Sequence, residues 1–346
     1  MGTRGRASGL ALALAITLTA AGCFGPPSPP SPPSPPSPAP APPPAAVTPS
    51  PAPVTQLTYA VGARILRLER GADRPLPTLL FYPVGQPTAA AGDVGAAAAG
   101  ERPPPGRTEP ARRKRVHVVQ GKLAWTARPP ATGRFPLVLF CHGLSGSPER
   151  YADALAGWAA AGFVVAAPTF PHTSEFTDDF RRPDIVNQPA DARYVLARVQ
   201  ALGRTRGDPL WHRIDTDHMA LIGHSAGGYT ATGLLTAGHD PRLRAGVIMA
   251  GWAAKGAFAG PPATMLFLQG TADPIVRVAA SRRLFARVPW PKSYLLMRHN
   301  SHATYLRPGD IGYSLMRSTV IAFLRWTLTG DEPARGMLPH IVYPVA

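Results

Sequence analysis

The sequence contains very few cysteines. Only Cys23 and Cys141 occur among its 346 residues, so at most one intrachain disulfide could form. Cys141 lies within an apolar strand pattern, where a thiol packs as a small hydrophobic group, and we expect it to be buried and free. If Cys23 is modified, no intrachain disulfide is possible, and the fold then depends on its core alone.

Charged residues are also scarce, and acidic ones most of all. Asp and Glu total 20 against 36 Lys and Arg, which gives a formal net charge of +16. Such a chain could bind nucleic acid or an anionic membrane. Nearly all of the positive charge is arginine, and it is scattered, with one dense run at 112–115. No basic face with interleaved aromatics, zinc spacing or nucleic-acid motif is present. We therefore expect no nucleic-acid partner. The positive charge is more simply interpreted as a weak attraction to an anionic envelope.

The N-terminal apolar run, residues 10–21, is too short to span a bilayer as a stable anchor. Arg4 and Arg6 precede it and small residues end it, which is the layout of a secretory signal. It ends in Ala-Ala-Gly-Cys, which resembles the lipobox of bacterial lipoproteins and implies lipidation of Cys23. The alternative is an ordinary signal peptide cut near the end of this run. We expect residues 1–22 to be a lipoprotein signal peptide. The protein would then be extracytoplasmic and membrane-anchored through its lipid, or secreted if Cys23 is not lipidated.

Proline is concentrated after this segment. Residues 26–53 are almost wholly Pro, Ser and Ala, a composition that cannot bury a core and favours extended polyproline II. We therefore expect residues 23–53 to be the lipidated Cys and a linker that holds a domain away from the membrane. The folded domain would span residues 54–346. A flexible insertion is expected near residues 85–115, where Ala, Gly, Pro and Arg predominate.

The remaining sequence alternates apolar strand patterns with helical ones. This alternation predicts an α/β domain with a mostly parallel central sheet and helices on both faces. Strands are expected at 63–68, 76–84, 116–125, 136–141, 163–167, 218–222, 245–250, 264–269 and 293–297, and helices at 148–161, 189–202, 226–235, 278–288 and 314–329.

One stretch, Gly-His-Ser-Ala-Gly-Gly, stands between a predicted strand and a predicted helix. If the strand passes straight into the helix, the middle residue, Ser225, is forced into a strained backbone conformation. Its neighbours two positions away must then be small, and Gly223 and Gly227 satisfy this, while Gly228 lets the helix pack near the strand. The hydroxyl would project from the carboxyl edge of the sheet at the positive end of a helix. The alternative is a glycine turn with a capping serine, but the strand–helix context favours a nucleophile.

A serine hydroxyl is a weak nucleophile until a base takes its proton. Two histidines follow the predicted strand at 293–297. We expect His302 to be the base, since it lies farther into the loop and can reach back over the sheet edge. His299 lies nearer the strand end and is expected to be structural. A metal held by this pair would lack carboxylate ligands, and we expect no metal.

The base in turn needs a carboxylate that fixes its tautomer. Asp273 follows the predicted strand at 264–269 and should emerge at the same edge; the alternative is an ordinary turn aspartate before proline. The chain order Ser225, Asp273, His302 is the order of α/β-hydrolases rather than of the two protease classes with this triad.

Backbone N–H groups could complete such a site. The N–H of Leu144, after the strand at 136–141, and that of Ala226, at the helix start, can both point at it. Each such oxyanion donor is worth about 2.7–4 kcal/mol of transition-state stabilisation. His142, beside this loop, is expected to brace it.

Several segments resemble known proteins: HGLSGSPERYADALAGWAAAGFVV, DIVNQPADARYVLARV, ALIGHSAGGYTA, LQGTADPIV and NSHATYL. From about residue 57 onward the chain is similar to α/β-hydrolases related to platelet-activating-factor acetylhydrolase and to predicted dienelactone hydrolases. The resemblance implies an α/β-hydrolase fold and ester hydrolysis through an acyl-enzyme. It maps the nucleophile, acid and base to Ser225, Asp273 and His302, and the oxyanion donors to Leu144 and Ala226. True dienelactone hydrolases use a cysteine nucleophile, so the serine favours the esterase branch.

Three further features can be interpreted either as functional or as ordinary structural elements. In polyester-degrading cutinase relatives, a Trp stands after the strand that follows the turn with the nucleophilic serine. Trp252 occupies the corresponding position here. It could line an acyl pocket or pack in the core. Residues 170–173 could form a lid or a pocket rim, or simply a surface loop. Asp191 is expected in the first turn of a helix.

Together these patterns predict a serine ester hydrolase that acts on short or medium acyl esters or on lipid-like esters. It would need neither a metal nor an organic cofactor, and its partners would be an ester substrate and the membrane that holds its lipid anchor. Two alternatives stay open. One is an envelope acyl transferase with the same triad, and the other is a surface lipoprotein that binds lipid without catalysis.

Overall fold

The computed structural model describes residues 57–89 and 128–338, except residue 237. The expected signal peptide, lipidation site and linker lie outside the described residues. So do most of the expected insertion and the strand expected at 116–125.

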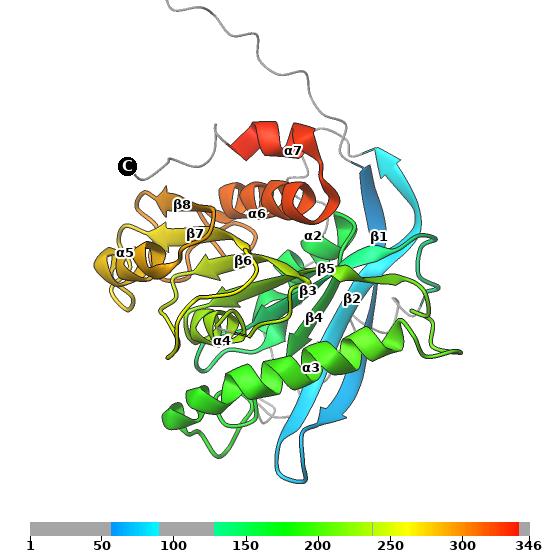
Figure 1. Cartoon of the computed structure of the whole chain (residues 1–346), viewed down its shortest axis with the longest axis horizontal. Helices are drawn as coiled ribbons and strands as arrows, with labels where there is room; N and C mark the ends of the chain where they lie inside the picture. Colours follow the sequence, from blue (N-terminus) through cyan, green and yellow to red (C-terminus); the bar gives the residue numbers. More distant parts are fainter. Residues whose placement is uncertain (1–56, 90–127, 237, 339–346) are drawn as a thin grey trace, which may run out of the picture. The chain divides into compact units, whose positions relative to one another are not determined.

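One sheet organises the domain (Figure 1). Its strands are β1 (Leu57–Glu69), β2 (Pro75–Ala89), β3 (Phe135–Cys141), β4 (Val164–Pro168), β5 (Ile214–His224), β6 (Leu243–Met249), β7 (Thr264–Gly270) and β8 (Lys292–Met297). They follow the order β1-β2-β4-β3-β5-β6-β7-β8. β2 runs antiparallel to both neighbours, whereas β4, β3, β5, β6, β7 and β8 are mutually parallel. The predicted α/β class with a mostly parallel sheet is confirmed.

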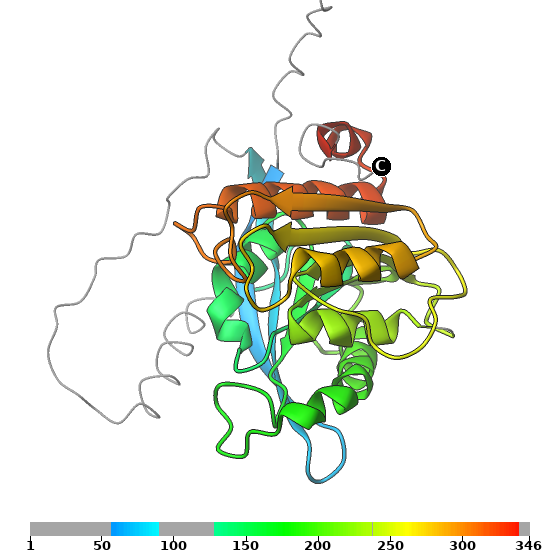
Figure 2. The same ribbon diagram turned by 90° about the vertical axis from the view of Figure 1, so that its left-hand side faces the viewer.

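Helices cover both faces of this sheet. They are η1 (Pro148–Tyr151), α2 (Ala152–Ala160), η2 (Arg182–Asn187), α3 (Gln188–Leu202), α4 (Ala226–Leu234), α5 (Val278–Arg287), α6 (Tyr313–Thr329) and α7 (Glu332–Met337). Figures 1 and 2 show α2 and α6 on one face and α3, α4 and α5 on the other. Within the described residues, no helix combines the length and the apolar character needed to cross a membrane.

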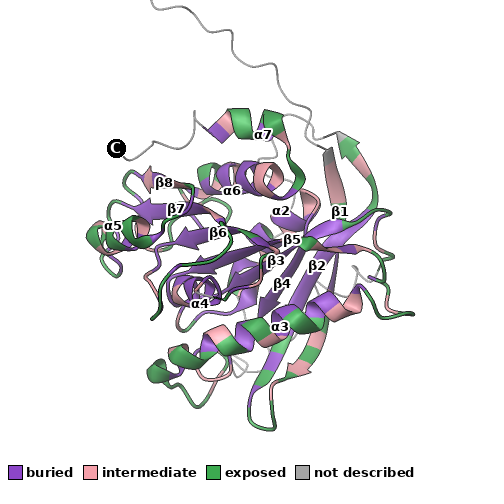
Figure 3. Ribbon diagram, in the orientation of Figure 1, coloured by how far each residue is buried: buried purple, intermediate pink, exposed green. Residues whose placement is uncertain are grey.

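The core is divided by the sheet into two layers, and successive strand residues alternate between them. In β3, Val138 and Phe140 pack with residues of α2 and α6, whereas Leu137 and Leu139 pack with residues of α3 and α4. All seven residues of β3 are therefore buried, as expected of a parallel strand covered on both faces. Figure 3 shows the same burial along the central strands. Cys141 is buried and free, as predicted, and this burial raises the pKa of its thiol.

The end of β2 and the presence of α7 both differ from the sequence prediction. The flexible insertion was expected to start at residue 85, but β2 continues through Ala89, because its last residues pair with Leu57 and Thr58 of β1. The short helix α7 was not predicted. It begins with a cap in which the Asp331 carboxylate accepts from the Ala334 N–H at 3.0 Å, an arrangement that stabilises a helix start.

Buried charges connect the β1–β2 hairpin to α3. Asp191 does lie in the first turn of α3, as predicted, but it is fully buried. Its Oδ1 accepts from Arg70 Nε at 2.7 Å and from Arg74 Nε at 2.9 Å. Arg74 also donates from Nη2 to Asp184 Oδ2 at 2.8 Å, and these two carboxylates raise the pKa of its guanidinium. Two segments distant in sequence, residues 70–74 and 184–191, thus meet in one ion cluster.

Candidate active site

Ser225 occupies a sharp turn between β5 and α4. Its backbone has φ 55° and ψ −119°, a conformation that costs a non-glycine residue about 1–3 kcal/mol. The flanking glycines show why the turn can close. A Cβ on Gly223 would lie 2.1 Å from the Gly227 carbonyl oxygen, and a Cβ on Gly227 would lie 1.9 Å from the Cys141 oxygen. The strain and the tight packing expected of the Gly-His-Ser-Ala-Gly-Gly turn are both present.

Asp273 and His302 meet at the carboxyl end of the sheet. His302 Nδ1 lies 2.8 Å from Asp273 Oδ2. The carboxylate is fully enclosed, while 13% of the imidazole surface is exposed. The bond to Asp273 assigns the proton of the neutral ring to Nδ1 and leaves Nε2 as the basic nitrogen. His299, the other histidine of this loop, is exposed.

The Asp273 carboxylate accepts four hydrogen bonds. Besides His302, Gln269 Nε2 donates to Oδ2 at 3.0 Å, and the N–H groups of Ile275 and Val276 donate to Oδ1 at 2.8 and 2.9 Å. Burial alone would raise the pKa of this carboxyl group, but the hydrogen bonds from His302 and the backbone more than offset it and lower the pKa below its ordinary value. Asp273 is thus held ionised and fixed in orientation.

The loop that carries His302 is joined to the loop that carries Asp273. The N–H of Ala272 donates to the Asn300 carbonyl at 3.0 Å, and the N–H of His299 donates to Thr271 Oγ1 at 2.9 Å. A Cβ on Gly270 would lie 2.2 Å from the Asn300 oxygen, so the two loops approach as closely as backbones can. His299 has φ 60° here, and its backbone N–H makes the contact with Thr271.

A second histidine, His224, contacts the backbone of His302. His224 precedes Ser225 and is buried; its Nε2 lies 2.9 Å from the His302 carbonyl oxygen, and its Nδ1 lies 2.9 Å from the Tyr151 hydroxyl. Burial, followed by the neighbouring His302, lowers the pKa of His224 to about 3. The ring is therefore neutral, donates from Nε2 to the carbonyl and accepts from the tyrosine. This hydrogen bond joins the backbone of His302 to the strand–helix turn that carries Ser225.

The loop after β3 lies against Ser225. A Cβ on Gly143 would lie 3.1 Å from the Ser225 Cβ, and the next residue, Leu144, lines the same cavity as Ser225. The Leu144 N–H has no hydrogen bond within the described chain. The N–H of Ala226, the first residue of α4, has no acceptor inside its helix. Two backbone N–H groups without a described acceptor thus lie close to the serine.

His142 braces this loop, as expected. Its Nδ1 donates to the Gly143 carbonyl at 2.8 Å, and its Nε2 accepts from the Phe170 N–H at 3.1 Å. Burial lowers the pKa of His142 to about 4. The segment 170–173 does not line the cavity that contains Ser225, so it is neither a lid nor a rim of that pocket, and it is not a plain surface loop either. Phe170 and Thr173 are fully buried. The Phe170 ring packs on His142 with centroids 5.0 Å apart, and Thr173 Oγ1 accepts from Gln188 Nε2 at 2.6 Å.

A cavity of about 660 Å³ brings the reactive groups together, since Ser225 and His302 both line it. Leu144, Trp252, Ile275, Val276, Ala279 and Ala280 form its apolar walls. Trp252 is half-buried and lies 6.3 Å, centroid to centroid, from the Tyr229 ring, so it both lines the cavity and packs against α4. Asp273 lies behind His302 and does not line the cavity.

Gln269, His224 and Tyr151 did not emerge from the sequence as parts of the site. Gln269 left one signal, because it is a polar residue at the end of an otherwise apolar strand. No sequence pattern indicated Tyr151, since its partner, His224, lies 73 positions away. Within the described residues, no group of three or more His, Cys, Asp or Glu side chains could hold a metal.

Comparison with known families agrees with this geometry. A family described as PET hydrolase-like matches residues 157–334, just over half of the chain. A second family, described as platelet-activating factor acetylhydrolase, isoform II, matches residues 114–198. No curated protein matches the sequence. The first match contains Ser225, Asp273 and His302, and both families are ester hydrolases of the α/β-hydrolase superfamily.

Proposed function

The chain belongs to the PET hydrolase-like family and is an ester hydrolase of the α/β-hydrolase superfamily, and we propose that it acts through a serine nucleophile and an acyl-enzyme intermediate. The observation that supports this most strongly is that a strained serine, a histidine and a carboxylate occur together at one site. Ser225 stands on a strained strand–helix turn and lines the same cavity as His302. The Nδ1 atom of His302 is hydrogen-bonded to the buried carboxylate of Asp273.

In the acylation step, Ser225 Oγ attacks the ester carbonyl while His302 Nε2 takes the hydroxyl proton. The negative charge that develops on the carbonyl oxygen is stabilised by the N–H groups of Leu144 and Ala226. Asp273 remains ionised and stabilises the imidazolium. The C–O bond to the leaving alcohol then breaks, and the alcohol oxygen receives the proton from His302.

Deacylation repeats these roles with water. His302 takes a proton from a water molecule, whose oxygen attacks the acyl carbonyl, and the serine leaves with that proton. A carboxylic acid is released and the enzyme is restored. No step requires a metal or an organic cofactor.

We propose esters with short or medium acyl chains, or lipid-like esters, as substrates. An apolar-walled cavity of about 660 Å³ falls in the usual range for small-molecule sites. Trp252 offers a flat apolar face to an acyl chain or to an aromatic acid. A chain-length series of p-nitrophenyl esters tests this. Turnover should peak at a short or medium acyl length and fall to the uncatalysed rate in Ser225→Ala.

Two other functions predict different results in the same assay. An acyl transferase would form a new ester when an alcohol acceptor is added, which product analysis by mass spectrometry detects, whereas a hydrolase releases free acid. A lipoprotein that only binds lipid would give no turnover that depends on Ser225. Persistent turnover in a folded Ser225→Ala variant would contradict the proposed nucleophile.

We further propose that Cys23 is lipidated and holds the enzyme at the outer side of a membrane. The proposal rests on the basic start, the apolar run and the Ala-Ala-Gly-Cys ending of the N-terminal segment. Expressed in bacteria, the full chain should partition into the detergent phase of a phase-separation assay, and Cys23→Ser should move it to the aqueous phase. Equal partitioning of both chains would contradict lipidation and favour secretion.

A further inference from the structure

The cavity around Ser225 and His302 has basic side chains in its lining. Besides its apolar walls, it is lined by three arginines, Arg182, Arg277 and Arg283. No Asp or Glu of the described residues lines it. Asp273, the carboxylate that His302 contacts, is enclosed and already accepts four hydrogen bonds. The cavity therefore has a strongly positive lining.

These arginines have no acidic partner within the described chain, unlike several of their neighbours. Arg181 donates to Asp179 at 2.7 Å, and Arg150 donates to Glu175 at 2.8 Å. Arg182, Arg277 and Arg283 are exposed and form no ion pair with the carboxylates that the structure describes. Their guanidinium groups are therefore available to a ligand in the cavity.

The three side chains come from two separate elements. Arg182 begins η2, whereas Arg277 is the N-cap residue of α5 and Arg283 lies within that helix. The first turn of α5 has no acidic residue, and its Ala279 and Ala280 line the cavity. The partial positive charge of the helix start adds to that of the arginines. An anion in this cavity would meet positive charge from two walls.

We propose that the preferred substrates are esters that carry a carboxylate or phosphate group near the scissile bond, and that Arg182, Arg277 and Arg283 bind this group. The inference rests on the proposed function, because it specifies which esters the same site selects. Guanidinium groups match the oxygens of carboxylate and phosphate in bidentate geometry. An exposed ion pair contributes a factor of about 1.5 to 5 in affinity, so three arginines together predict a preference of about 3- to 100-fold, with about tenfold in the middle of that range.

A matched pair of substrates tests a carboxylate on the acyl side. Mono-p-nitrophenyl adipate carries a terminal carboxylate, and its methyl ester has the same chain without the charge. After correction for uncatalysed hydrolysis, kcat/KM should be about tenfold higher for the anionic ester at low salt. The ratio should fall towards one in 1 M NaCl, where the screening length shrinks to about 3 Å.

A second pair tests a phosphate on the alcohol side. 1-Butyryl-glycerol 3-phosphate and monobutyrin differ only in the phosphate, and butyrate release can be followed by titration. A preference in this pair alone indicates a phosphate-bearing alcohol, and a preference in the adipate pair alone indicates a carboxylate-bearing acyl group. Either result supports the inference.

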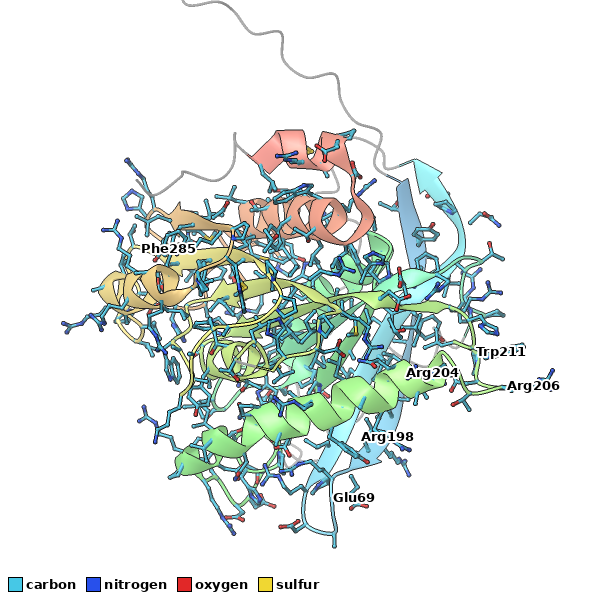
Figure 4. All side chains as sticks on the ribbon, viewed as in Figure 1. Glu69, Arg198, Arg204, Arg206, Trp211 and Phe285 are labelled. Carbon is cyan, nitrogen blue, oxygen red and sulfur yellow. The ribbon has the colours of Figure 1, made fainter. Side chains whose placement is uncertain are left out.

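Variants separate binding in the cavity from general attraction to a basic protein. Arg182→Gln, Arg277→Gln and Arg283→Gln should each lower the anionic-to-neutral ratio of kcat/KM about 1.5- to 5-fold. Arg282→Gln is the matched control, because Arg282 is exposed and adjacent to Arg283 but does not line the cavity. Arg204→Gln is a remote control. Figure 4 shows Arg204 at the end of α3, on the opposite side of the view from Phe285 of α5. Neither control should change the ratio.

Two results would overturn the inference while leaving the proposed function intact. One is equal kcat/KM within both substrate pairs for an enzyme that hydrolyses them through Ser225. The other is a loss of preference as large in Arg282→Gln or Arg204→Gln as in the cavity variants. Failure of the folded protein to hydrolyse any of the four esters would instead contradict the proposed function itself.

Discussion

Single side chains at this site depend on partners from distant parts of the sequence. Asp273, fixed by four hydrogen bonds, can hold His302 in only one orientation. The position of the His302 backbone is set in turn by His224. Such a chain of contacts makes the imidazole a pre-positioned base before any substrate arrives, which is what efficient proton transfer requires.

Asp273→Asn should remove most of the activity and little of the fold. An amide can replace some of the hydrogen bonds, but it cannot hold the same histidine tautomer or stabilise an imidazolium, and kcat should fall about 10³- to 10⁴-fold. Asp179→Asn, at an exposed carboxylate outside the cavity, is the control and should retain normal kcat. A loss smaller than tenfold in Asp273→Asn would remove this carboxylate from the mechanism.

His142 should make stability depend on pH. Its pKa is about 4 in the folded protein and near 6.5 when unfolded, so the unfolded chain binds more protons between these values. Stability from this group is therefore complete at neutral pH and is lost as pH falls below about 6.5. The free energy of unfolding measured in urea should drop by about 2 kcal/mol more between pH 7 and pH 4.5 in the wild type than in His142→Gln. Equal drops would contradict the buried neutral state.

Ser225, Asp273 and His302 could be selected from the sequence because each stands just beyond a recognisable strand, and parallel strands bring their carboxyl ends to one edge. His224 and Tyr151 could not, since their roles depend on which backbone lies above them after folding. Arg277 and Arg283 looked like ordinary members of a basic, arginine-rich chain. Only the shape of the cavity distinguishes them from Arg282.

Strands and helices were largely predictable, and the reason is their burial. The central strands are covered on both faces and appear as apolar runs, whereas the end of β2 depends on pairing with β1, which composition does not reveal. The elbow between β5 and α4 is the element on which the site depends most. Its glycines are required by contacts with backbone atoms, which cannot move aside.

Two glycine substitutions test this packing. A Cβ on Gly227 would lie 1.9 Å from the Cys141 carbonyl oxygen, whereas a Cβ on Gly336, in α7, would meet nothing within 4 Å. Gly227→Ala should destabilise the domain by about 3 kcal/mol or more, or prevent folding. Gly336→Ala should be neutral or stabilise by up to about 1 kcal/mol. Thermal unfolding distinguishes the two, and similar midpoints would contradict the close approach of α4 to β3.

Across the folded domain, the buried cluster of Arg70, Arg74, Asp184 and Asp191 fixes the β1–β2 hairpin on α3. This cluster could not be predicted from the sequence, because its residues come from two distant segments and each residue taken alone is an ordinary surface type. Burial raises the pKa of Asp184, but its bonds with Arg74 and Asn187 prevail and lower that pKa overall. Its contribution to stability is thus present at neutral pH and is lost as pH falls through the lowered pKa.

Removing one charge from this cluster should be costly. Asp191→Asn leaves Arg74 and Arg70 without a fully buried partner, and unfolding free energy should fall by about 3–5 kcal/mol. Glu332→Gln breaks an exposed pair with Arg335 and should cost less than about 1 kcal/mol. Chemical denaturation of both variants provides the comparison. A small effect of Asp191→Asn would show that the hairpin is held chiefly by apolar packing.

The most direct test of the mechanism is covalent labelling with a fluorophosphonate, which reacts with activated serine hydroxyls and requires no knowledge of the natural ester. We expect the purified protein to gain one probe mass, with the modification on the peptide that contains Ser225. Ser225→Ala should not react, and His302→Ala should react far more slowly. Labelling at another serine, or none in a folded wild-type protein, would contradict the mechanism proposed for this enzyme.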